Sequence, residues 1–96
     1  MNLLEETLQI LRAELPYLHQ QYHVRQLGVM GSVARGEATP QSDIDVLVEF
    51  DGRIGLRFVD LVDHLEAKLS RPVDVISRRA IRPEVWSEIE SEVVYV

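Results

Sequence analysis

The fold of this chain is decided by the stretch Asp-Ile-Asp-Val-Leu-Val-Glu-Phe, residues 43–50. Every second residue from Ile44 to Phe50 is apolar, and the positions between them hold Asp45, Leu47 and Glu49. Because side chains alternate between the two faces of a strand, the pattern predicts a strand with one apolar face towards the core. The side chains at positions 43 and 45 then point the same way, with Cα atoms roughly 6.5–7 Å apart at ~3.3 Å per residue.

Helices and further strands are predicted on both sides of this stretch. Asn2 can cap an N-terminal helix, and Glu5 stands three residues later, at the reciprocal capping position. Leucines at positions 4, 8, 11 and 15 form one helical face, and Pro16 is expected to kink this helix or to start a second short one ending near Tyr22. The remaining patterns predict strands at 24–30 and 72–76, a tight turn or short helix at 32–36, helices at 56–69 and 83–90, and a further candidate strand at 92–96.

The order of these elements indicates an α/β (α+β) fold, a small mixed β-sheet flanked by helices. With 96 residues, 46% of them hydrophobic and 27% charged, the chain has room for one small globular domain, residues 1–96. The pattern does not determine the order of the strands in the sheet.

Composition excludes several kinds of function. The sequence has no cysteine, which rules out disulfides, thiolate zinc sites and cysteine nucleophiles. The net charge of −6 disfavours nucleic-acid binding, which needs surplus Lys and Arg, but suits divalent cations. No apolar run approaches the ~18 residues of a membrane span, and the acidic N-terminus is unlike a signal peptide. We therefore expect a cytoplasmic protein without membrane contact.

Carboxylates suggest a metal site. Asp43 and Asp45 are held by a strand whose other face is anchored in the core, and Asp74 is the one acid in a short apolar strand. If the two strands pair, the three carboxylates can converge, and a cation would relieve their repulsion. Hard oxygen ligands favour Mg²⁺, which often shares its coordination shell with substrate phosphates. Asp74 can also be read as an exposed acid on an edge strand.

A glycine and a serine suggest a phosphate site beside these carboxylates. Gly31-Ser32 follows the predicted strand 24–30, and glycine allows a phosphate to approach the backbone closely. Free N–H groups at the start of a helix would favour an anion, and Ser32 adds a hydroxyl donor. Arg35 could contact a phosphate or form an ion pair with Glu37. A phosphate site beside a metal site suits phosphoryl or nucleotidyl transfer.

These residues also carry a family resemblance. Gly31-Ser32, ten intervening residues and then Asp43-Ile44-Asp45 resembles the signature of the DNA polymerase beta-like nucleotidyltransferase superfamily. The fuller runs, 31–37 and 42–48, resemble its small bacterial and archaeal branch, the minimal nucleotidyltransferases. The resemblance implies the nucleotidyltransferase fold, a mixed sheet flanked by helices.

The resemblance also implies roles for the site residues. Gly31 and Ser32 would hold the triphosphate of ATP, Asp43 and Asp45 would bind two Mg²⁺ ions, and Asp74 would complete the metal site and help activate the acceptor hydroxyl. Members of this branch are often antitoxins that transfer AMP from ATP to a tyrosine of a HEPN-domain toxin. The chain lacks the C-terminal helical domain of larger members, so we expect a partner protein to complete the site.

Two other functions remain open at this point. The chain could be a non-catalytic antitoxin or assembly subunit that inhibits its partner by binding alone. It could also transfer a nucleotide to a small molecule or an RNA end, although the acidic composition disfavours RNA. Asp43→Asn or Asp45→Asn separates catalysis from binding, because a purely steric inhibitor would still neutralise its partner.

Overall fold

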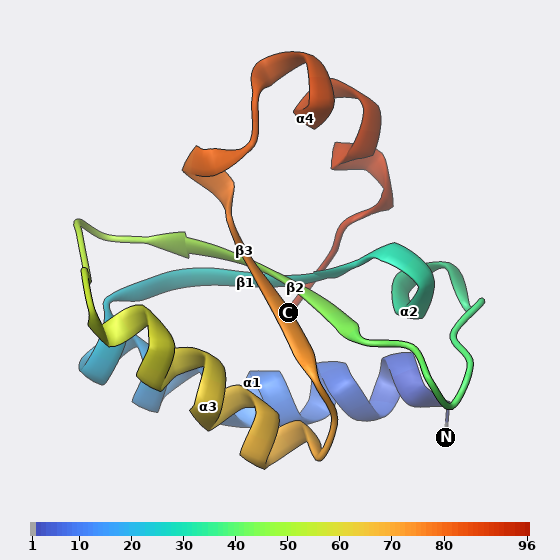
Figure 1. The fold of residues 1–96 in the computed structure, drawn as a ribbon, viewed down its shortest axis with the longest axis horizontal. Helices are drawn as coiled ribbons and strands as arrows, with labels where there is room; N and C mark the ends of the chain where they lie inside the picture. The colour runs from blue at the N-terminus through green and yellow to red at the C-terminus, as the bar shows by residue number, and fades with distance from the viewer. Residues whose placement is uncertain (1) are drawn as a thin grey trace.

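The computed structural model describes residues 2–96, and it forms a four-stranded mixed sheet with helices on both sides (Figure 1). The predicted α+β class is confirmed. In chain order, the described residues form four α-helices (α), four strands (β) and two short 3-10 helices (η): α1 (Leu3–Tyr22), β1 (Val24–Met30), α2 (Gly31–Arg35), β2 (Ile44–Phe50), α3 (Arg57–Leu69), β3 (Val73–Ser77), η1 (Arg78–Ala80), α4 (Pro83–Ile89), η2 (Glu90–Glu92) and β4 (Val94–Tyr95).

The sheet has the strand order β3-β2-β1-β4, which the sequence left open. β1 pairs with β2 and with β4 in antiparallel fashion, whereas β2 and β3 are parallel. The parallel pair is possible because α3 carries the chain back from the end of β2 to the start of β3. As a result, the N-terminal ends of β2 and β3 lie side by side, next to the C-terminal end of β1.

The core lies between the sheet and the two long helices, α1 and α3, which cover the same face (Figure 1). Ile44, Val46 and Val48 are fully buried there, as the alternation in β2 predicts. The opposite face is crossed by the segment that contains α4, which leads from β3 at one edge to β4 at the other (Figure 1). Leu47 points to that second face and is still only 1% exposed.

The first helix runs from its predicted cap through Pro16, where the sequence predicted either a kink or the start of a second short helix. Asn2 caps α1 through its side-chain oxygen, which accepts a 2.8 Å hydrogen bond from the Glu5 N–H, as expected. The helix then continues through Pro16 to Tyr22, so no second helix starts at the proline. Proline removes one helical hydrogen bond, but the turns beyond it bury Leu18 and Tyr22, and this packing offsets the loss.

The C-terminal helix begins at Pro83 as predicted, since proline suits the first helical position. Its apolar residues are unequally buried, because Val85 is 40% exposed while Trp86 and Ile89 are half-buried. Seven residues give α4 fewer than two full turns, and none of them is fully buried. Within residues 2–96, no helix is both long enough and apolar enough to span a membrane.

Candidate active site

The parallel pairing of β2 and β3 brings two of the predicted carboxylates next to each other. Asp45 is the register partner of Asp74, and the neighbouring partners are Ile44 and Val73. Facing residues of paired strands project from the same side of a sheet, so both carboxylates lie on the second face. Asp43 immediately precedes β2. It is exposed, as is Asp74, whereas Asp45 is half-buried.

Gly31, which follows β1, lies against the carboxylate of Asp45 on the side opposite β3. Its neighbour Met30, the last residue of β1, is the register partner of Asp45. Gly31 has φ +68°, a conformation that L side chains rarely adopt, and a Cβ built on it would overlap the Oδ2 atom of Asp45. A side chain at residue 31 would therefore force either the Asp45 carboxylate or the turn after β1 to move.

The short helix α2 follows directly, with Ser32 in its first turn. Within residues 2–96, the N-cap residue Met30 makes no side-chain hydrogen bond to the first N–H groups of α2. The helix ends at Gly36, whose N–H donates a hydrogen bond to the Val33 carbonyl. Because α2 follows directly after Met30, the register partner of Asp45, the helix starts at the same end of β1 and β2 as Asp45.

Arg35 forms the ion pair that the sequence offered as one of two alternatives. Its Nε lies 3.3 Å from Glu37 Oε2, and its Nη1 lies 3.9 Å from Glu92 Oε1. All three side chains are well exposed, so these contacts contribute little to stability. The Arg35 charge also lowers the pKa of Asp45, which indicates that the guanidinium is close enough to sense this carboxylate.

Asp45 is a site carboxylate whose pKa is shifted by its surroundings. Burial raises the pKa of Asp45 above its ordinary value, and the charges of Asp74 and Asp43 raise it further. Arg35 opposes this shift but does not reverse it. A half-buried carboxylate beside two other acids is an environment that a bound cation would relieve.

This shift predicts a pH-dependent gain in stability when Asp45 is replaced by Asn. A raised pKa means that the folded protein holds the Asp45 proton more tightly than the unfolded chain, so stability falls as pH rises from the ordinary value of 3.8 through the raised pKa. Without divalent metal, we expect Asp45→Asn to increase the free energy of unfolding at neutral pH by a few tenths of a kcal/mol, the scale of a cross-strand charge contact. Urea denaturation should show this gain at neutral pH and its loss below pH 3.8. A gain that is equal at both pH values would contradict the assignment.

The donor chemistry fits a hard divalent cation. Within the described part of the chain, no three Asp, Glu or His side chains are already gathered into a ligand set. The Asp45–Asp74 register nevertheless offers oxygen ligands from two adjacent strands, with Asp43 two residues from Asp45. Carboxylate oxygens are the ligands that Mg²⁺ prefers, and Mg²⁺ usually completes its shell with water or substrate phosphate.

Comparison with known proteins identifies the family. A family model described as "Nucleotidyltransferase domain" matches residues 4–96. The chain belongs to the nucleotidyltransferase-domain family. This nucleotidyltransferase is 39% identical over 97 residues to the protein adenylyltransferase MntA of Thermococcus cleftensis, and the match covers 100% of this chain and 98% of that relative.

Solved structures agree with this assignment. One structure, named as a candidate minimal nucleotidyltransferase, has a TM-score of 0.78 and 37% identity to this nucleotidyltransferase, covering 98% of this chain and 95% of the other. The resemblance to the minimal nucleotidyltransferases is therefore confirmed. A complex of a tri-AMPylated Shewanella oneidensis HEPN toxin with its MNT antitoxin has a TM-score of 0.59 at 17% identity, covering 97% of this chain and 67% of that one, and supports the fold alone.

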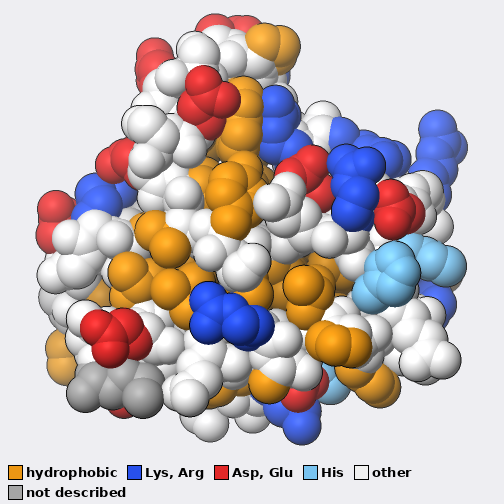
Figure 2. Space-filling view, turned by 180° about the vertical axis from the view of Figure 1, so that it is seen from behind, with side chains coloured by type: hydrophobic (Ala, Val, Ile, Leu, Met, Phe, Trp, Pro, Cys, Tyr) orange, Lys and Arg blue, Asp and Glu red, His pale blue; other side chains and the backbone are white. Residues whose placement is uncertain are grey.

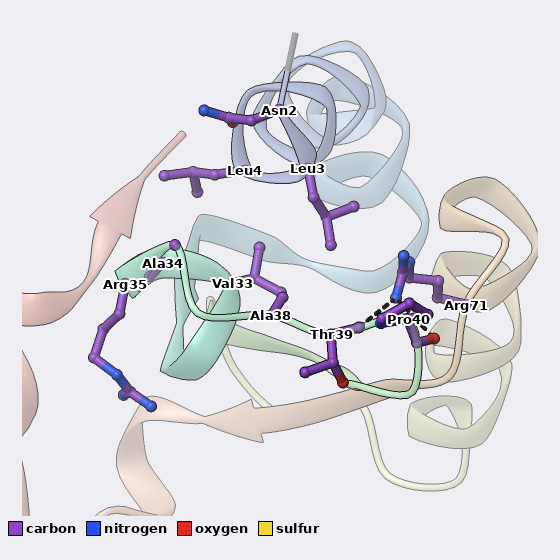
Figure 3. Close-up of a pocket in the computed structure, with 11 residues that line it drawn as sticks. Asn2, Leu3, Leu4, Val33, Ala34, Arg35, Ala38, Thr39, Pro40 and Arg71 are labelled. Carbon is purple, nitrogen blue, oxygen red and sulfur yellow. Dashed lines mark hydrogen bonds between the residues drawn. The ribbon is translucent and has the colours of Figure 1, made fainter.

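A cavity of this nucleotidyltransferase lies away from the carboxylates. It has a volume of about 540 Å³ and lies between the start of α1, helix α2 and the segment 38–40. Figure 3 shows Leu3, Leu4, Val33 and Ala38 along its walls, while the side chain of Arg35 extends away from the two leucines. Arg35 and Arg71 also line it, whereas Gly31, Ser32 and the three aspartates do not, so this cavity does not coincide with the predicted phosphate and metal sites.

Two further arginines, Arg78 and Arg25, have structural partners. Arg78 stacks on the half-buried ring of Trp86, with its Cζ atom 3.9 Å from the ring centroid, so that face of the ring is not free to stack on a base. Arg25 pairs with Glu49 at 3.2 Å and with Asp51 at 3.6 Å. From behind, acidic and basic side chains lie close together towards the upper right of the surface, whereas hydrophobic side chains gather near its centre (Figure 2).

Proposed function

We propose that this nucleotidyltransferase transfers AMP from ATP to a hydroxyl group of a partner protein, a HEPN-class toxin, and so acts as its antitoxin. One observation carries the proposal: the glycine turn after β1 packs directly against Asp45, the register partner of Asp74. The same turn starts α2, so the anion site and the carboxylate site that we propose would lie at the same end of β1 and β2. The names of the adenylyltransferase relative and of the toxin–antitoxin complex support the type of reaction and of partner.

Each site residue has a role in this proposal. Gly31 and Ser32 would bind the triphosphate, and Arg35 would exchange an exposed carboxylate partner for a phosphate. Asp43, Asp45 and Asp74 would hold two Mg²⁺ ions, which supply positive charge that offsets the negative charge of the transferring phosphoryl group. Asp74 is exposed, and we also assign to it the proton of the acceptor hydroxyl.

The proposed reaction is a displacement at the α-phosphorus of ATP. The acceptor oxygen forms a bond to this phosphorus, the bond to the oxygen that bridges to the β-phosphate breaks, and pyrophosphate leaves. The proton of the acceptor hydroxyl goes to the carboxylate of Asp74. We propose a tyrosine hydroxyl as acceptor, because the resemblance to toxin-modifying members implies it.

Two forms of labelled ATP test this proposal. With the partner toxin and Mg²⁺, α-³²P-ATP should label the toxin and γ-³²P-ATP should not, because AMP keeps only the α-phosphate. EDTA should abolish the label. Transfer of the γ-label would indicate a kinase, and no transfer of either label by the intact pair would overturn the proposed activity.

A binding-only antitoxin remains the second candidate, because the carboxylates of the described residues are not gathered into a ligand set. It predicts that Asp45→Asn neutralises the toxin as well as the unchanged protein does, in a growth assay with both proteins expressed. AMP transfer predicts that the variant fails to protect the cells.

A further inference from the structure

Arg71 binds the segment that leads into the carboxylate strand. Its Nη1 atom lies 3.4 Å from the carbonyl oxygens of Thr39 and Pro40 and 3.3 Å from that of Ser42. Figure 3 shows this guanidinium directed at residues 39 and 40. In the sequence, Arg71 lies between the predicted helix 56–69 and the predicted strand 72–76, three residues before Asp74.

The position of Arg71 links the starts of both carboxylate strands. Ser42 is the residue before Asp43, and Arg71 precedes β3 by two residues. A second link lies beside it, because the Ile44 N–H donates a 3.1 Å hydrogen bond to the Pro72 carbonyl. The guanidinium therefore joins the backbone just before Asp43 to the backbone just before Asp74.

Few other contacts hold the segment 39–42. Thr39, Pro40 and Gln41 are exposed, so packing does not fix them. The turn is closed from within by Ser42, whose hydroxyl accepts a 2.9 Å hydrogen bond from the Thr39 N–H. Three carbonyl oxygens around one cationic nitrogen with two hydrogens make a charge–dipole contact as well as hydrogen bonds.

We propose that Arg71 is a positioning residue for the divalent-metal site: it fixes the backbone before Asp43 relative to β3 and so sets the separation of Asp43 from Asp74. This inference rests on the proposed function, because it assumes that the carboxylates bind a metal. Groups that orient metal ligands typically change metal affinity by 10- to 100-fold when they are removed.

Positioning and simple electrostatics predict opposite effects of removing this charge. A cation near an acidic site repels a metal ion, so electrostatics alone would let Arg71→Met bind metal more tightly. Positioning predicts about tenfold weaker binding. Arg71→Lys should bind nearly as tightly as the unchanged protein, because an ammonium group keeps the charge and three N–H donors for the carbonyls.

The test is titration of the purified proteins with Mn²⁺, followed by electron paramagnetic resonance of the free ion. The matched control is Arg12→Met, which removes an exposed arginine from α1 and should leave affinity unchanged. Urea denaturation checks that each variant is folded. If Arg71→Met does not fold, Ser42→Ala removes the side-chain hydrogen bonds of the same turn while the Arg71 side chain stays, and it should weaken Mn²⁺ binding several-fold.

The outcomes separate this inference from the proposed function. Weaker binding by Arg71→Met with recovery in Arg71→Lys supports positioning. Equal or tighter binding by a folded Arg71→Met overturns it, as does unchanged binding by Ser42→Ala where that variant replaces it. If the unchanged protein binds no Mn²⁺, with or without ATP, the metal site of the proposed function fails first.

Discussion

Asp45→Asn is expected to lower the rate of AMP transfer at least about 100-fold while the protein stays folded. A metal ion contributes several kcal/mol of charge stabilisation in such reactions, and about 1.4 kcal/mol corresponds to a tenfold change in rate. Asparagine keeps the size of the side chain. It removes the negative charge of Asp45, the carboxylate whose pKa the fold raises. Single-turnover transfer of α-³²P-AMP measures the effect, and Asp43→Asn should act in the same direction.

Glu49→Gln is the matched control for this experiment. Glu49 lies on the same strand and the same face as Asp45, but its carboxylate pairs with Arg25 at 3.2 Å. Neutralising Glu49 also removes one negative charge, yet it should change the transfer rate less than about twofold, because an exposed ion pair contributes little. A similar loss in both variants would mean that overall charge, rather than the Asp45 site, controls the activity.

Gly31→Ala is expected to have the second-largest effect, again about 100-fold on the transfer rate. The new Cβ would overlap Oδ2 of Asp45, so either the carboxylate or the turn must move. A displacement of about 1 Å in a reacting arrangement can cost roughly 100-fold. The left-handed conformation at residue 31 adds a stability cost of about 1 kcal/mol.

Gly36→Ala separates these two effects. Gly36 has φ +74°, close to the +68° of Gly31, but a Cβ at Gly36 meets no atom within 4 Å. Both variants should therefore lose about 1 kcal/mol in urea denaturation, and only Gly31→Ala should lose most of its activity. Equal activities of the two variants would contradict the role of the Gly31–Asp45 contact.

Local patterns predicted most elements of the fold. The alternation in residues 44–50, the cap at Asn2 and the helix start at Pro83 are short-range features, and the structure contains all three. Continuation of α1 through Pro16 depends on tertiary packing of the turns beyond the proline, which no local pattern reports. Leu47 is buried although its neighbours on the same strand face are acidic, and the C-terminal residues Val93 and Tyr95 lie over Gly28, its register partner.

The site was predictable in its residue types but not in its geometry. The spacing of Asp43 and Asp45 on one strand indicated a shared direction, yet their relation to Asp74 depends on β3 lying parallel to β2. That pairing is a long-range property, because α3 separates the two strands in the chain. Two further features also appear only in three dimensions. They are the close approach of Gly31 to Asp45 and the contacts of Arg71 with the segment before Asp43.

The register of β2 determines both which of its side chains enter the core and where the site residues lie. The pairing that buries Val46 and Val48 is also the one that places Asp45 opposite Met30 and Asp74. An inserted residue between Asp45 and Val46 would turn one half of the strand over, exposing the valines or burying the carboxylate. The same insertion at Gly52 falls in an exposed connection and costs little. Tolerance to length changes should therefore differ sharply between these two neighbouring positions.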